Sequence, residues 1–387
     1  MVAYENELSR LVEQLNRSKA PVRTGEGASL DQLLTLAVQR NASDILLVAG
    51  SAVALRIRGA LTPSAEKPLA PEEIHSLLRP LLSTEQSEEL DRNKSLDFCF
   101  VRGSIGRFRA NFHYQRGTLA ASIRVLPAQI PSLDSLHLPA SLAVLAERRQ
   151  GLVLLTGPTG CGKTSTLAAL IDLINARRRD HIITIEDPIE YQHANRSSIV
   201  EQIQVGHDTP SFAHAVRAVL RQDPDVILVG EMRDSETMAA ALTAAETGHL
   251  VLSSLHTNDT SQTMSRILDI LPPGRQSPIA GQSQMRQQLS LALLAVISQQ
   301  LVPAADKINR YPAVEIMMAT SAIRNLIRTG QDHQIRSHIS TGRAEGMMTM
   351  EQSLVELVRS GRIHRDTAID HCYHAAELRQ YLDEPVR

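Results

Sequence analysis

The chain has 387 residues, 43% of them hydrophobic, so it exceeds the usual size of one domain and can fill two cores. Its formal net charge of −2 and its 3% aromatic content argue against a protein that binds nucleic acid directly. Three isolated cysteines and the absence of a long apolar run argue against a disulfide framework, a cysteine zinc site and a transmembrane segment, and we expect a cytoplasmic protein.

The N-terminal third predicts a short helix, a linker and a small α/β domain. Residues 1–28 carry leucines at helical spacing followed by proline and glycine. Residues 29–126 form the domain, and a proline-bearing linker over residues 127–139 follows it. The helices expected in the domain are Leu30–Gln39 and Pro71–Leu82, and the strands are Ile45–Val48, Ala54–Ile57, Phe108–Tyr114 and Ala120–Val125.

The rest of the chain alternates apolar runs with helical segments. This alternation over residues 140–345 is typical of a parallel sheet with helices on both faces. The last segment, residues 346–387, is predicted to be helical because Leu354, Leu357 and Val358 share one face. The expected strands are residues 152–155, 182–185, 226–229, 250–252 and 314–317.

The most specific motif is a G-x-x-x-x-G-K-[ST] phosphate-binding loop between an apolar run and a helical segment. Its glycines allow the backbone N–H groups to surround phosphate oxygens, Lys163 reaches the β and γ phosphates, and Thr164 offers its hydroxyl to Mg²⁺. The residues expected to bind the nucleotide here are Gly157, Pro158, Thr159, Gly160, Cys161, Gly162, Lys163, Thr164 and Ser165.

Two acidic segments follow predicted strands. Glu231 comes after the run 226–229 and one glycine, which places it at the carboxyl end of a strand, where open α/β sheets bind ligands. A carboxylate there can hold the hydration shell of Mg²⁺ or orient an attacking water. Glu186, Asp187 and Glu190 end the strand over 182–185, and beside a phosphate loop we interpret them as functional rather than as a solvated turn.

Two histidines flank the strand over residues 250–252. Because they are seven residues apart, strand alternation points them to opposite faces, and a shared metal is not expected. His256 follows the strand and is placed to sense a γ-phosphate, whereas His249 precedes it and is as consistent with a structural role.

Basic residues lie on strands of the N-terminal domain. Arg109 and Arg124 could supply a guanidinium to a transition state that spreads charge over phosphoryl oxygens. A solvated surface is the other interpretation of the same residues.

Taken in order and spacing, these motifs resemble those of the secretion-ATPase superfamily of hexameric motors, and within it the type IV pilus retraction ATPases of the PilT family. The resemblance covers nearly the whole chain from Ser29 to Leu382. The subfamily assignment depends mainly on Ala322–Arg328, His333–Ile335 and Met348–Leu354, which resemble the tail of retraction motors. Cys161 departs from the pattern because the loop usually has Ser there.

The resemblance implies a RecA-like ATPase core with a smaller PAS-like N-terminal domain and a helical C-terminal tail. It also implies that ATP and Mg²⁺ bind, that Thr164 and Glu231 face the metal, partly through water, and that His249 and His256 form a histidine pair. Glu231, Glu190 and His256 would be catalytic, with Arg109 and Arg124 as arginine fingers. The implied partners are identical subunits of a homohexamer, a pilus platform protein at the inner membrane and a second retraction ATPase.

Two alternatives stay open at this point. An accessory ATPase that supports another retraction motor would carry the same motifs. A nucleic-acid translocase could be built on the same core, although the near-neutral charge and the scarce aromatic residues argue against it.

Overall fold

The computed structural model describes residues 29–64, 67–270 and 278–383, which fold as two compact units. One unit ends at Ala128 and the other begins at Gln129. The helix predicted within residues 1–28 lies outside the described residues. No helix in the described ranges is both long and apolar enough to span a bilayer.

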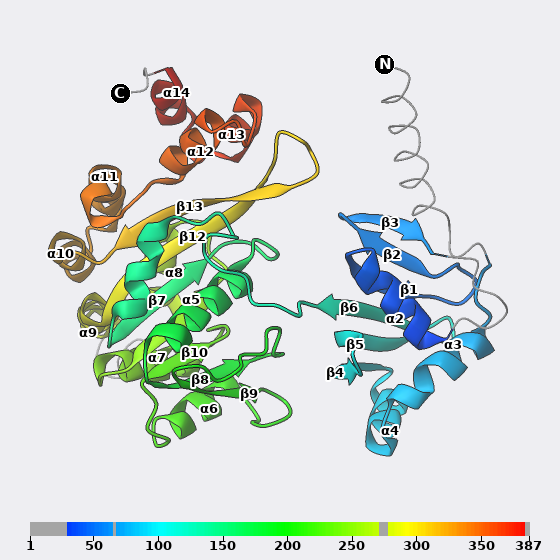
Figure 1. The fold of residues 1–387 in the computed structure, drawn as a ribbon. Helices are drawn as coiled ribbons and strands as arrows, with labels where there is room; N and C mark the ends of the chain where they lie inside the picture. Colours follow the sequence, from blue (N-terminus) through cyan, green and yellow to red (C-terminus); the bar gives the residue numbers. More distant parts are fainter. Residues whose placement is uncertain (1–28, 65–66, 271–277, 384–387) are drawn as a thin grey trace, which may run out of the picture. The chain divides into compact units, whose positions relative to one another are not determined.

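The first unit is an antiparallel sheet covered by helices (Figure 1). Its strand order is β3-β2-β1-β6-β5-β4, and Phe108, Phe112 and Ile123 lie fully buried in its core. The prediction found four of these strands but missed β3, β4 and α4. The elements are α2 (Leu30–Gln39), β1 (Ala42–Leu47), β2 (Ala54–Ile57), β3 (Ala60–Pro63), α3 (Pro71–Leu78), η1 (Arg79–Leu81), α4 (Thr84–Asn93), β4 (Ser95–Arg102), β5 (Gly106–Gln115) and β6 (Thr118–Leu126).

The second unit is built on a seven-stranded sheet with the order β13-β12-β7-β11-β10-β8-β9. Six strands are parallel, but β13 pairs antiparallel with β12, so the expected parallel sheet is in fact mixed. The prediction missed β9 and β12. The strands are β7 (Gly151–Thr156), β8 (His181–Glu186), β9 (Ile199–Gln204), β10 (Val226–Val229), β11 (Leu250–Leu255), β12 (Leu293–Pro303) and β13 (Arg310–Met318).

Helices cover both faces of this sheet, as the sequence predicts. Successive residues of β7 serve opposite cores: Leu152 and Leu154 pack with α6, α7 and α9, whereas Val153 and Leu155 pack with α5 and η2. An apolar run buried on both faces is what a central parallel strand requires. These helices are η2 (Ala140–Glu147), α5 (Lys163–Arg177), α6 (Phe212–Val219), α7 (Ser235–Glu246), α8 (Thr260–Ile270) and α9 (Pro278–Ala292).

The chain ends in short helices, which Figure 1 shows beyond β13. Thr349 begins α12 with a capping box to Gln352, and α12 packs with α13 and α14 in a small separate core. These elements are α10 (Ser321–Thr329), η3 (Asp332–Gln334), α11 (Ile335–Thr341), η4 (Arg343–Glu345), α12 (Met350–Arg359), α13 (Arg365–His371) and α14 (Ala375–Asp383).

The segment expected to be a linker, residues 127–139, is partly built into the second unit. Leu138 is buried, and Leu133 and Leu136 pack beside it against the core that α5 and η2 form. From Gln129 onward this segment belongs to the second unit, and its C-terminal half packs into that core.

Candidate functional site

The phosphate-binding loop joins β7 to α5 and has the backbone that its glycines permit. Gly157 has φ +140°, and a Cβ there would lie 2.1 Å from the Gln299 carbonyl oxygen. Gly162, with φ +92°, is the N-cap of α5. Both positions therefore require glycine. Pro158, Thr159 and Gly160 form the exposed tip of the loop between them.

Lys163 is the first residue of α5 and is held inside the loop. Its Nζ donates to the carbonyl oxygens of Gly157, at 2.7 Å, and Pro158, at 3.1 Å. Burial lowers the pKa of Lys163, while the nearby Cys161 and Glu231 oppose that change. A buried ammonium held by neutral carbonyls is suited to binding an anion at the N-terminus of α5.

Glu231 and His256 come to the same place from neighbouring strands. His256 Nε2 lies 3.1 Å from Glu231 Oε1, and His256 Nδ1 lies 3.5 Å from Lys163 Nζ. An ammonium can only donate, so this geometry suits a tautomer in which Nδ1 accepts and Nε2–H donates to the carboxylate. The parallel strands thus bring Lys163, Glu231 and His256 to one edge of the sheet.

Arg233 contacts the other oxygen of Glu231 at 2.8 Å. Burial raises the pKa of Glu231, but the Arg233 and His256 contacts outweigh it, so the pKa of Glu231 is lowered and the carboxylate stays charged at neutral pH. Because both carboxylate oxygens already have partners, Glu231 fits a metal through a bridging water better than as a direct ligand.

Sequence reasoning missed Gln299, which clamps the phosphate-binding loop from β12. Its side chain donates to the Cys161 carbonyl at 2.6 Å and accepts from the Thr166 hydroxyl at 2.9 Å. Gln299 is only 4% exposed. The available signal was a Ser-Gln-Gln run inside the apolar stretch of residues 295–302, which marks buried polar groups that need partners.

The acidic segment after β8 divides into a buried and a more exposed carboxylate. Glu186 is buried and accepts from the Thr184 hydroxyl at 2.7 Å, and burial raises its pKa. Glu190 is half-buried in the loop that follows. The next residue, Tyr191, bonds the Ser165 hydroxyl at 2.8 Å and so ties this loop to the start of α5.

His249 lies at the other end of β11 from His256. Its Nδ1 lies 2.9 Å from the Ala244 carbonyl oxygen and closes the turn between α7 and β11. Seven residues of strand separate the two histidines by roughly 20 Å, which is too far for a shared ligand within this chain. The structure therefore brings His256, but not His249, to Lys163.

Arg109 and Arg124 both lie in the first unit. Arg124 Nε bonds Asp44 at 2.9 Å, and Arg109 lies 3.9 Å from Asp97. Both side chains stay partly exposed, at 57% for Arg124 and 37% for Arg109. Arg124 is thus the more firmly held of the two candidate fingers.

Three features together suit a nucleoside triphosphate. The loop presents N–H groups and an ammonium to phosphate, Thr164 is exposed beside Lys163, and Glu231 is an ionised carboxylate that can polarise water. A hydroxyl and a carboxylate are oxygen donors of the kind that Mg²⁺ prefers.

Comparison with known proteins finds extensive similarity. Residues 27–381 match the family described as Type II/IV secretion system protein. The chain is 43% identical over 315 residues to the twitching motility protein of Neisseria gonorrhoeae, covering 81% of this chain and 82% of that one. It is 38% identical over 349 residues to the type IV pilus ATPase PilU of Pseudomonas aeruginosa, covering 90% of each.

A solved structure is similar over the same extent. The crystal structure of the pilus retraction motor PilT with bound ADP superposes with a TM-score of 0.83 at 43% identity, covering 91% of this chain and 99% of that one. The mixed α/β arrangement, with a smaller N-terminal unit, a RecA-like core and a helical C-terminal region, is thus the one the sequence predicts.

Proposed function

Because the chain belongs to the type II/IV secretion system protein family, we propose that it hydrolyses ATP to drive the retraction of type IV pili. The observation that carries this proposal is the meeting of Lys163, Glu231 and His256 beside the phosphate-binding loop. Similarity to the PilT motor with ADP, and to a twitching motility protein, supports the same activity.

In this mechanism the loop N–H groups and Lys163 bind the phosphates, and Thr164 directs its hydroxyl to Mg²⁺. The metal, when bound, neutralises charge that develops between the β and γ phosphates. Glu231 orients and activates the attacking water, with Glu190 assisting. His256 contacts both Lys163, which would bind the γ-phosphate, and Glu231, so it would link the presence of the terminal phosphate to the catalytic carboxylate.

The remaining parts of the site would come from other chains or from the first unit. An arginine, Arg109 or Arg124, would approach the γ-phosphate and complete the site in some subunits of a homohexamer. Hydrolysis would then change the relation between the two units and move a pilus platform protein at the inner membrane.

Two substitutions test the enzyme assignment in the purified protein. Lys163→Ala should abolish ATP turnover, because the phosphates lose their ammonium. Glu231→Gln should lower kcat by at least about 1,000-fold while ATP stays bound, since water activation is lost and the loop is intact. Turnover at the unmodified rate in either variant would contradict the assignment.

A test in cells addresses the use of that turnover. Deleting the gene should give hyperpiliated, non-twitching cells, and a wild-type copy, but not the Lys163→Ala copy, should restore twitching. Rescue by the Lys163→Ala copy would show that hydrolysis by this chain does not power retraction.

An accessory role is the second candidate, because the chain is as extensively similar to PilU as to PilT. An accessory ATPase would hydrolyse ATP but would not support retraction in cells that lack every other retraction ATPase. Expressing this chain alone in such cells separates the two roles: restored twitching identifies a principal motor, and its absence identifies an accessory one.

A further inference from the structure

The loop that carries His256 is held in place by the C-terminal segment. Two residues after His256, the backbone carbonyl of Asn258 accepts a hydrogen bond of 2.8 Å from the Tyr373 hydroxyl. Tyr373 lies between α13 and α14, 115 residues further along the chain. The tail thus contacts the backbone of a residue that directly follows the candidate active site.

A second anchor holds the same loop four residues after His256. Both the backbone N–H and the hydroxyl of Thr260, at the start of α8, donate to Glu315 Oε1, at 3.1 and 2.7 Å. Glu315 lies on β13 and is 3% exposed. Thr257 and Thr263 flank the two anchors, and their buried hydroxyls pair at 2.6 Å, so the loop is also fixed from within.

The two anchors are joined to each other through the half-buried guanidinium of Arg336. Arg336 Nη1 lies 3.8 Å from Glu315, and Arg336 Nη2 bonds Glu351 at 2.8 Å and also contacts Glu377. The other oxygen of Glu351 accepts the backbone N–H groups of Tyr373, at 3.0 Å, and the next residue.

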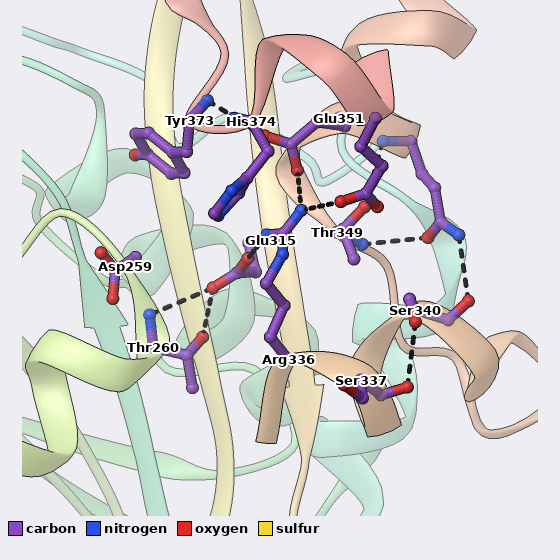
Figure 2. A network of polar contacts seen from close by, with 12 residues as sticks. Asp259, Thr260, Glu315, Arg336, Ser337, Ser340, Thr349, Glu351, Tyr373 and His374 are labelled. Atoms are coloured by element: carbon purple, nitrogen blue, oxygen red, sulfur yellow. Dashed lines mark hydrogen bonds and ion pairs between the residues drawn. The ribbon is translucent and has the colours of Figure 1, made fainter. Parts of the chain in front are cut away.

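Figure 2 shows these contacts as one network in which Arg336 lies between Glu315 and Glu351. From Asn258 through Tyr373, Glu351, Arg336 and Glu315 back to Thr260, the contacts form a closed ring. Glu351, which is fully buried, belongs to the segment Met348–Leu354 that marks the tail in the sequence. One ring of contacts therefore fixes the loop that carries His256 at both Asn258 and Thr260.

We propose that Tyr373 is a positioning residue for ATP hydrolysis, which holds His256 against Glu231 through the backbone of Asn258 and is itself fixed by Glu351 and Arg336. This inference rests on the proposed function. In this role the C-terminal segment positions a residue of the nucleotide site, in addition to packing against the core.

The hydrogen bond from the Tyr373 hydroxyl to Asn258 should persist across the neutral pH range. Burial, and next the negative charge of Glu315, raise the pKa of Tyr373, so its hydroxyl stays protonated and can donate. Burial also raises the pKa of Glu315, whose Oε1 is saturated by two donors from Thr260.

Tyr373→Phe tests the proposal because it removes the hydroxyl and keeps the ring. We expect kcat for ATP to fall about fivefold, the size expected for the loss of one hydrogen bond, while the dissociation constant for ATP stays within twofold. Tyr311→Phe is the matched control: Tyr311 lies on β13 with its ring against His137 and Arg362, and its variant should keep the wild-type kcat. Equal kcat in Tyr373→Phe and wild type would overturn the proposal.

A double variant separates positioning from general loosening. If Tyr373 acts through His256, Tyr373→Phe should leave the residual kcat of His256→Ala unchanged. A fivefold loss in both backgrounds would mean that the tyrosine acts elsewhere.

Hydrogen exchange of the peptide over residues 256–260 gives a readout that needs no turnover. Exchange should be faster in Tyr373→Phe and unchanged in Tyr311→Phe, and unchanged exchange in Tyr373→Phe would also overturn the proposal. If the wild-type chain hydrolyses no ATP, the proposed function fails, while the exchange experiment still decides whether Tyr373 holds the loop.

Discussion

The two units differ in how many polar side chains they bury. Among the described residues of the first unit, the buried polar side chains are Asp44 and Ser64, whereas the second unit buries Lys163, Glu315 and Glu351 among many others. Burying such groups costs free energy unless each finds partners, and the partners here are specific. The second unit is thus built around fixed polar contacts, and the first unit can contribute chemistry mainly through exposed residues.

The largest expected effect on stability comes from replacing a buried carboxylate, and one such residue from each unit can be compared. Glu351→Ala should lower the free energy of unfolding by about 3 kcal/mol, because it removes a fully buried carboxylate from Arg336 and leaves the part-buried N–H groups of Tyr373 and His374 without their acceptor. Asp44→Ala should cost only about 1 kcal/mol, since its partners Arg124 and Arg56 are well exposed to water. Urea unfolding followed by circular dichroism measures both.

Glu356→Ala serves as the control on the same helix as Glu351. Its ion pair with Arg343 is exposed, so the variant should change stability by no more than about 0.5 kcal/mol. Equal losses in Glu351→Ala and Glu356→Ala would mean that burial does not separate the two kinds of contact.

The next test concerns α10, the helix of the retraction-type tail. Leu326 and Ile327 belong to the segment that resembles retraction motors, but both are buried in the core of the second unit, so replacing them tests packing and not coupling. Leu326→Ala should therefore cost about 3 kcal/mol in thermal or urea unfolding. Arg328, which is exposed on the same helix, is the better probe of coupling, and Arg328→Ala should leave stability nearly unchanged.

Because Arg328→Ala should not change stability, it also tests whether α10 couples ATP hydrolysis to pilus retraction. If α10 transmits hydrolysis to the pilus, Arg328→Ala should reduce twitching while keeping ATP turnover. Normal twitching would exclude Arg328 from that role.

A smaller effect should appear as a pH dependence from the second unit. Burial lowers the pKa of His193 to about 4. Its folded pKa lies below the unfolded value, so the unfolded chain binds more protons and stability falls as the pH drops from 6.5 toward 4. The loss between pH 7 and pH 5 should be about 2 kcal/mol. His193→Gln should remove that part of the pH dependence, and an unchanged slope would contradict the assignment.

Only a small change in stability is expected from Arg124→Ala in the first unit. Its exposed contact with Asp44 predicts a loss of at most about 1 kcal/mol. If Arg124 serves as a finger, kcat should nevertheless fall at least about tenfold, with ATP binding retained. Arg109→Ala, measured in the same assay, identifies which of the two arginines acts, and wild-type kcat in both variants would remove both.

The sequence predicted the parts of the site that local patterns encode. The phosphate-binding loop and the carboxylate after β10 each follow an apolar run, so their place at the sheet edge follows from short-range order. The same reasoning found β7 and β10 but missed β12, because Ser298 and Gln299 interrupt its apolar pattern.

Contacts between distant segments could not be predicted in this way. Tyr373 meets Asn258, and Arg336 meets Glu315 and Glu351, only because the fold brings separate elements together. Periodicity also gave no sign that β13 would run antiparallel, because an apolar strand reads alike in either direction.

Cys161 gives the molecule a practical property. It is 3% exposed inside the phosphate-binding loop, and burial raises the pKa of its thiol, so it reacts slowly with alkylating dyes. Cys99 in the first unit and Cys372 in the second are half-buried and outside that loop. Burial raises the pKa of the Cys372 thiol as well, and Cys372 directly precedes Tyr373, so a dye there would disturb the contact with Asn258. Cys99 is therefore the natural position for a label that leaves the nucleotide site intact.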